Sequence, residues 1–242
     1  MTLPIGAPED PSASQGLSYA GVFVNADRRL LLDQLAQRRF SGWLGPQEGD
    51  WVLAVAEQAT GAVAGGGTAL TTLARDLAHA LGAVVIVARV ERDRVLRLDG
   101  WDGTDDDGHD EPEPLGSYLS DPSVDATPDD EDDEVYLEPI GVEFAPSYAR
   151  SCGVPEATGE LTEVLEEELD PESVFESERL DSVLRLLELP RWLISAGSLP
   201  GDVPAGPRRS ELVRLGAGRE GLPGLVVGAV TGVLRRRRRR LT

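Results

Sequence analysis

The residues from Ala83 to Val90 (AVVIVARV) are nearly all apolar, and this run constrains the fold more than any other part of the chain. A strand that packs on one face only alternates apolar and polar residues, whereas a strand that is covered on both faces does not. The run therefore predicts a strand that is buried on both faces.

The elements expected around this strand follow the order β-α-β-β-α-β-β. The predicted strands span 19–25, 42–44, 51–57, 83–90 and 94–99, and the two predicted helices run from a cap at Asp27 to about Phe40 and from a cap at Thr68 through Leu81. This order indicates an α+β fold, the split βαβ pattern of a ferredoxin-like sandwich with one further strand. In that architecture two helices cover one face of an antiparallel sheet, and because many unrelated functions use it, the fold implies none of them.

Composition divides the chain into five segments. Residues 102–138 contain 16 acidic residues and no basic one, a composition that favours a solvated loop over a packed core. Short apolar pieces at 117–120 and 135–144 could add strands to the sheet edge. Further along the chain, an apolar stripe predicts a helix that ends before Pro190; its residues are Leu180, Val183, Leu184 and Leu187. The predicted segments are a disordered N-terminus (1–17), the ferredoxin-like α+β domain (18–101), an acidic linker or long loop (102–134), a mixed, mainly helical segment (135–220), and an apolar glycine-spaced segment with a poly-arginine tail (221–242).

Composition also excludes several kinds of chemistry. All 23 basic residues are arginine, so the chain has no Schiff-base lysine, no Ser-x-x-Lys pair and no P-loop lysine. Cys152 is the single cysteine, which excludes an intrachain disulfide. The first 16 residues lack signal-peptide features, and the apolar run of 14 residues from Gly221 to Leu234 is shorter than the roughly 20 that a membrane-spanning helix needs. We therefore expect a cytoplasmic protein without a transmembrane span.

The glycine-rich passage from Gly61 to Thr68 is the one candidate anion site. It matches the phosphate-binding pattern G-x-x-x-x-G-K-[ST] except that Gly67 stands where the lysine belongs. Backbone N–H groups at a helix start can hold an anion, but without the ammonium group nucleotide hydrolysis loses a central part. A plain connection between strand and helix explains the glycines more simply.

The remaining reactive residues form no recognisable constellation. The acids from Asp102 to Asp110, with His109 among them, lack the spacing of an EF-hand loop. His79 is expected to face solvent on the second helix, and Cys152 has no nucleophile motif around it. The four tryptophans (Trp43, Trp51, Trp101 and Trp192) are expected to anchor the core. The sequence thus predicts no catalytic, cofactor-binding or metal-binding residue, and an enzyme is the minority interpretation.

The C-terminal tail sets a cationic end against a chain whose formal net charge is −20. Its candidate contacts with an anionic partner are Arg235, Arg236, Arg237, Arg238, Arg239 and Arg240. On an anionic membrane surface each arginine would contribute about 1 kcal/mol to the free energy of binding. On duplex nucleic acid the six would make the logarithm of the binding constant fall with the logarithm of the salt concentration with a slope of about −5. The run could also fold back on acids of the same chain at Asp105 or Asp129–Glu134, or remain a solubilising end.

These features favour a non-enzymatic protein-interaction or adaptor protein that uses its arginine tail as a tether to an anionic surface. If that surface is a membrane, the protein would be a peripheral membrane protein. The partner is not identified by the sequence. Two alternatives stay open: an anion- or nucleotide-binding enzyme that works at Gly61 to Thr68, and a nucleic-acid-associated protein that binds through the tail.

Overall fold

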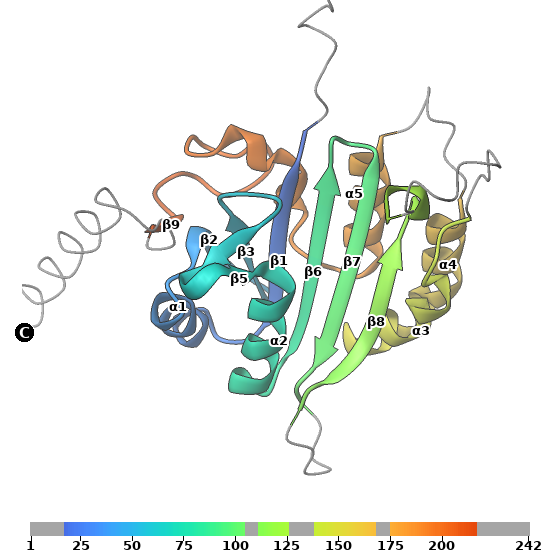
Figure 1. The fold of residues 1–242 in the computed structure, drawn as a ribbon, viewed down its shortest axis with the longest axis horizontal. Helices are drawn as coiled ribbons and strands as arrows, with labels where there is room; N and C mark the ends of the chain where they lie inside the picture. Colours follow the sequence, from blue (N-terminus) through green and yellow to red (C-terminus); the bar gives the residue numbers. More distant parts are fainter. Residues whose placement is uncertain (1–16, 105–110, 126–137, 168–174, 217–242) are drawn as a thin grey trace, which may run out of the picture.

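The computed structural model describes residues 17–104, 111–125, 138–167 and 175–216. They form an α+β fold around a seven-stranded antiparallel sheet in the order β8-β7-β6-β1-β3-β2-β9 (Figure 1). The strands are β1 (Tyr19–Asn25), β2 (Ser41–Glu48), β3 (Trp51–Ala56), β6 (Val84–Glu91), β7 (Val95–Asp102), β8 (Glu113–Leu119) and β9 (Val213–Gly216). A small second sheet pairs β4 (Ala62–Ala64) with β5 (Thr68–Ala69).

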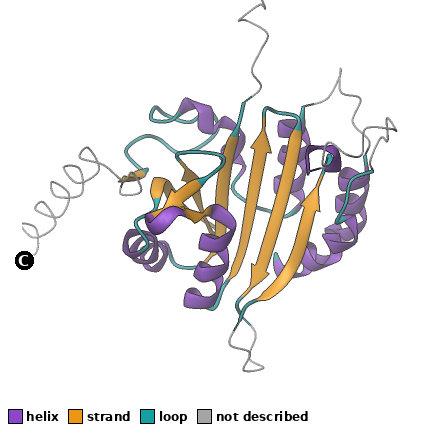
Figure 2. Cartoon of the chain, viewed as in Figure 1, coloured by secondary structure: helices purple, strands orange, loops and turns teal. Residues whose placement is uncertain are grey.

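The central strands of the large sheet are buried on both faces. Along β1, Val22 and Val24 pack into one hydrophobic core, whereas Phe23 between them packs into the other. In β6, Val85 and Ile86 divide in the same way, and both are nearly inaccessible to solvent. The strand predicted from the unbroken apolar run is therefore confirmed, with helices on both sides of the sheet (Figure 2).

Helices α1 (Arg28–Gln37) and α2 (Leu70–Leu81) cover one face of the sheet. Asp27 caps α1 as predicted, since its side chain accepts hydrogen bonds from the backbone N–H groups of Arg29 and Leu30. The predicted cap at Thr68 is wrong. Ala69 is the N-cap of α2 and supplies no side-chain bond, while the Thr68 hydroxyl donates to the Gly65 carbonyl oxygen.

The second face is covered by the helical part of the chain that follows the acidic segment. Helices α3 (Ala145–Ser151), α4 (Thr158–Glu166), α5 (Glu176–Leu186) and the 3₁₀ helix η6 (Arg191–Ser198) pack their apolar residues there, together with the short 3₁₀ turns η4 (Val142–Phe144) and η5 (Pro155–Ala157). The predicted stripe at Leu180, Val183, Leu184 and Leu187 is buried in this layer. The sequence predicts helices on one face only, whereas the later helices cover the other face and complete the sandwich.

Both edges of the sheet contain strands from outside the predicted α+β segment. Strand β8 lies within the acidic 102–134 segment and pairs with β7, so the apolar piece at 117–120 does return to the sheet edge. From the second piece, Ile140 forms an isolated bridge with Leu119, and residues 126–137 lie outside the described residues. At the other edge β9 pairs with β2, where the Arg214 guanidinium lies 5.0 Å from the ring centre of Trp43.

A buried ion pair fixes α5 to the sheet. Glu176 and Arg179 are only 4% and 5% exposed, and their charged groups lie 3.5 Å apart. Arg179 also donates to the Tyr118 hydroxyl on β8 and to the Glu167 carbonyl oxygen after α4, while the Tyr118 hydroxyl donates to the Leu165 carbonyl oxygen at 3.0 Å. Burial raises the pKa of the Glu176 carboxyl, an effect that the positive charge of Arg179 opposes. One guanidinium therefore joins α4, α5 and β8.

We expect Arg179→Leu to lower the free energy of unfolding by about 3–5 kcal/mol, because it leaves the Glu176 carboxylate buried without its counter-charge. Urea denaturation measures the change, and Arg185→Leu, at an exposed position of the same helix, is the matched control. The double variant Glu176→Leu/Arg179→Leu should recover much of the loss. An Arg179→Leu cost no greater than that of Arg185→Leu would contradict the role of the pair.

Candidate functional site

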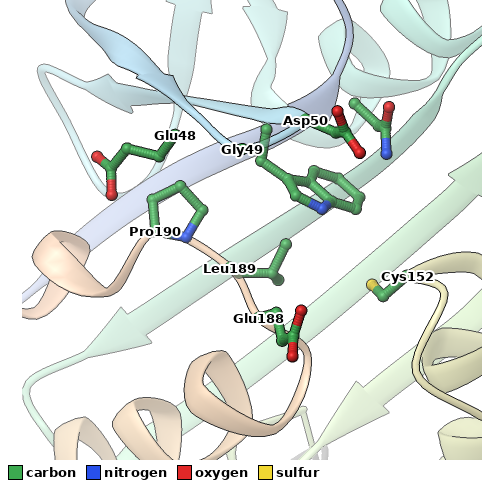
Figure 3. Close-up of a pocket in the computed structure, with 9 residues that line it drawn as sticks. Glu48, Gly49, Asp50, Cys152, Glu188, Leu189 and Pro190 are labelled. Atoms are coloured by element: carbon green, nitrogen blue, oxygen red, sulfur yellow. The ribbon is translucent and has the colours of Figure 1, made fainter.

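A cavity of about 290 Å³ lies where the β2–β3 turn meets the second helical layer. We call it the hairpin pocket. Figure 3 shows its lining residues as sticks on several elements: the turn itself, the end of β1, the end of α3 and the connection between α5 and η6. The lining residues are Asn25, Glu48, Gly49, Asp50, Trp51, Cys152, Glu188, Leu189 and Pro190.

The hairpin places two acids at the pocket through a two-residue turn. Glu48 pairs with Trp51 across the ladder, which leaves Gly49 and Asp50 as the turn residues. Gly49 has φ 57, a conformation that a hairpin turn needs at its first central position and that favours glycine. The tight turn presents the carboxylates of Glu48 and Asp50 to solvent, one on each side of the glycine.

Trp192 on η6 fixes the position of Glu48. The Trp192 ring packs directly over Gly45 of β2, where an added Cβ atom would lie 2.5 Å from the ring atom Cζ2. In that position the indole Nε1–H donates to Glu48 Oε1 at 2.9 Å. Partial desolvation raises the pKa of the Glu48 carboxyl, and the hydrogen bond from Trp192 acts in the opposite direction. The close approach at Gly45 thus holds one carboxylate at the pocket rim.

Glu188 supplies a third carboxylate from the end of α5. The N–H of Leu189 bonds to the Leu184 carbonyl oxygen at 2.9 Å, and the N–H of Glu188 bonds to the Arg185 carbonyl oxygen at 3.3 Å. This is the Schellman arrangement, in which glycine usually occupies the left-handed position. Glu188 occupies it here with φ 54, and its negative charge lies at the helix end that disfavours anions. Local stability therefore does not explain a glutamate at this position.

The inner wall of the pocket is apolar and unsuited to nucleophilic chemistry. Trp51 and Leu189 are 5% and 4% exposed, and both belong to the core of the second face. Cys152 follows α3, and burial raises the pKa of its thiol to about 12. A thiol with that pKa remains protonated near neutral pH, so it is a poor nucleophile and a poor metal ligand.

None of the three rim carboxylates forms an ion pair with an arginine within the described parts of the chain. Across the same ranges, no group of three or more His, Cys, Asp and Glu side chains has an arrangement that could hold a metal ion. The pocket therefore combines unneutralised negative charge at an exposed rim with a tryptophan and a leucine inside. Such a lining suits an organic cation that carries both charge and apolar surface.

The candidates predicted from the sequence do not meet at this pocket, apart from Cys152 and Trp51, which line it. Residues 61–68 form a separate unit of β4, the 3₁₀ turn η1 (Gly65–Gly67) and the start of β5, in which the Gly65 N–H donates to the Arg38 carbonyl oxygen at 2.9 Å. Its anion-binding role stays a prediction. His79 is exposed on α2, as expected, and Asp102 ends β7, where one carboxylate oxygen accepts from the Thr104 N–H at 2.8 Å.

Several predicted elements lie outside the described residues: the arginines Arg235 to Arg240, His109, and the acids from Asp105 to Asp110 and Asp129 to Glu134. The tryptophans follow the prediction in part, since Trp51 and Trp192 are buried while Trp43 and Trp101 are half-buried against the two cores.

Glu48, Asp50 and Glu188 are absent from the candidates predicted from the sequence. Only the tertiary fold brings the β2–β3 turn and the end of α5 together, so no local motif marks the pocket. One signal was available for Glu188: the predicted helix ends just before Pro190 with an acid, where glycine or a basic residue is usual.

Within the described ranges, none of the helices combines the length and the apolar character needed to cross a bilayer. Comparison with known proteins returned no matching family model, no matching curated protein and no matching solved structure.

Proposed function

We propose that this chain is a non-enzymatic protein-interaction protein that receives an arginine or lysine side chain of a protein partner in the hairpin pocket. The observation that carries the proposal is the set of three rim carboxylates, Glu48, Asp50 and Glu188, around an apolar wall and without an arginine of the described chain to pair with.

The chemistry of the lining favours a guanidinium group over other cations. Carboxylates accept paired hydrogen bonds from its planar fork, a contact that an ammonium group cannot make. The aliphatic part of an arginine side chain would pack against Leu189 and Pro190. Lysine offers the same charge without the planar fork, so we expect it to bind more weakly.

The size of the pocket favours a side chain over a cofactor. At about 290 Å³ it lies at the lower end of the range, roughly 300–1,000 Å³, that is usual for small-molecule sites. Arginine is also among the residues that most often dominate protein interfaces. One arginine side chain of a partner would fit both the volume of the pocket and the usual role of arginine at interfaces, while the partner's neighbouring residues contact the rim.

Three expectations from the sequence remain part of this proposal. The unit from β1 to β6 is proposed to be ferredoxin-like, supported by the antiparallel order β6-β1-β3-β2 and by the shared face of α1 and α2. The location is proposed to be cytoplasmic, and the arginine tail is proposed to tether the protein to an anionic surface. The latter two rest on composition alone.

We expect a capped hexa-arginine peptide to bind the pocket, and the triple variant Glu48→Gln/Asp50→Asn/Glu188→Gln to weaken that binding at least about tenfold, because several charge-assisted contacts are lost. Fluorescence anisotropy with a labelled peptide measures the affinity. All chains in this experiment have Arg235 to Arg240 replaced by glutamine, so that the peptide carries the only arginine run.

The matched control is Glu160→Gln/Glu163→Gln/Glu166→Gln, which removes three exposed carboxylates of α4, away from the pocket. If this control weakens peptide binding as much as the pocket variant does, the attraction comes from net charge and the proposed function is wrong.

We expect Glu188→Gly to raise the free energy of unfolding by about 1 kcal/mol and, at the same time, to weaken binding of the hexa-arginine peptide. Glycine relieves the left-handed backbone at φ 54 but removes one rim carboxylate. Arg39→Gly is the matched control, because Arg39 has φ 55 after α1 with the same pattern of backbone bonds, from Phe40 N–H to Leu35 O and from Arg39 N–H to Ala36 O. It should stabilise the protein similarly and leave the peptide affinity unchanged. A Glu188→Gly chain that binds with full affinity would show that Glu188 takes no part in binding.

A further inference from the structure

We infer that in the free protein the hairpin pocket is occupied by the chain's own C-terminal arginine run, Arg235 to Arg240, which an arginine-bearing partner must displace. This inference rests on the proposed function, because it names an occupant for the same pocket. The contact joins the acidic rim to the largest cluster of positive charge in the sequence.

Charge complementarity is the first argument. Six consecutive arginines follow a chain whose formal net charge is −20, and the pocket is lined by Glu48, Asp50 and Glu188, which form no ion pair within the described residues (Figure 3). One arginine can enter between the rim and Trp51 while its neighbours stay near Glu48 and Asp50. The run can shift by one residue without losing this arrangement, because every position offers the same side chain.

Chain length is the second argument. The described chain ends at Gly216, which pairs with Ser41 at the start of β2, and Glu48 lies seven residues further along the same strand. At about 3.4 Å per residue, the distance along β2 from that end to the pocket rim is about 24 Å. From Gly216 to Arg235 there are 19 residues, and a flexible chain of that length has a root-mean-square span of about 22–26 Å.

The agreement between these two lengths raises the effective concentration of the arginine run at the pocket. A tether whose average span matches the distance between its anchor and the site gives effective concentrations in the millimolar range. Modest intrinsic affinity is therefore sufficient for occupancy.

The test compares the labelled hexa-arginine peptide on the wild-type chain and on the chain with Arg235 to Arg240 replaced by glutamine. We expect at least about tenfold tighter binding to the glutamine chain, because its tail no longer competes. In the Glu48→Gln/Asp50→Asn/Glu188→Gln background this difference should disappear, whereas in the Glu160→Gln/Glu163→Gln/Glu166→Gln background it should persist. Thermal melts of all variants confirm that each remains folded.

The outcomes separate this inference from the proposed function. Equal peptide affinity for the wild-type and glutamine chains, with pocket-dependent binding in both, overturns the tail contact and leaves the proposed function in place. Absence of pocket-dependent binding in the glutamine chain overturns both. If the tail's competition with the peptide grows with protein concentration, a second copy of the chain supplies the tail. If that competition is lost with Asp129→Asn/Asp130→Asn/Asp132→Asn, the acidic segment holds the tail. Either result contradicts the inference.

Discussion

The structure depends on burying both faces of its central strands. β1, β3 and β6 place alternate apolar side chains into two cores, so neither face can remain in contact with water. Helices α1 and α2 cover one face, and the helices that follow the acidic segment cover the other. Stability therefore requires two parts of the chain that are separated in sequence by a segment too acidic to form a core of its own.

This constraint also places the hairpin pocket. The helical layer reaches the sheet through α5 and η6, and the connection between them passes the β2–β3 turn, where Trp192 packs over Gly45 and binds Glu48. The buried pair of Glu176 and Arg179 fixes the opposite end of α5 to β8 and the end of α4. With both ends of that helix held, Glu188 is presented at the pocket in a conformation that glutamate seldom adopts. A residue that departs from local preference at a pocket rim agrees with the binding role that we propose for this pocket.

Much of the fold could be predicted from local patterns, whereas the pocket could not. The strand at 83–90 and the cap at Asp27 follow from hydrophobic patterning and hydrogen bonding within a few residues of chain. The second helical layer could not be placed in this way, because an amphipathic helix shows which of its faces is buried but not the surface that covers it. Strand β9 was missed because its four residues carry too little pattern, and only the second half of β8, at 117–119, was anticipated because proline and acids surround the first half. Glu48 and Glu188 lie far apart in sequence, and only packing reveals that they line one cavity.

Hydrogen exchange followed by mass spectrometry at increasing urea tests most directly whether the two helical layers and the sheet form one cooperative unit. If the central strands depend on both layers, amides of β1, β6, α2 and α5 should open with the same free energy and the same urea dependence. Opening of residues 142–198 at a much lower free energy, while β1 and β6 stay protected, would show that the second layer is dispensable and would contradict this explanation of the fold.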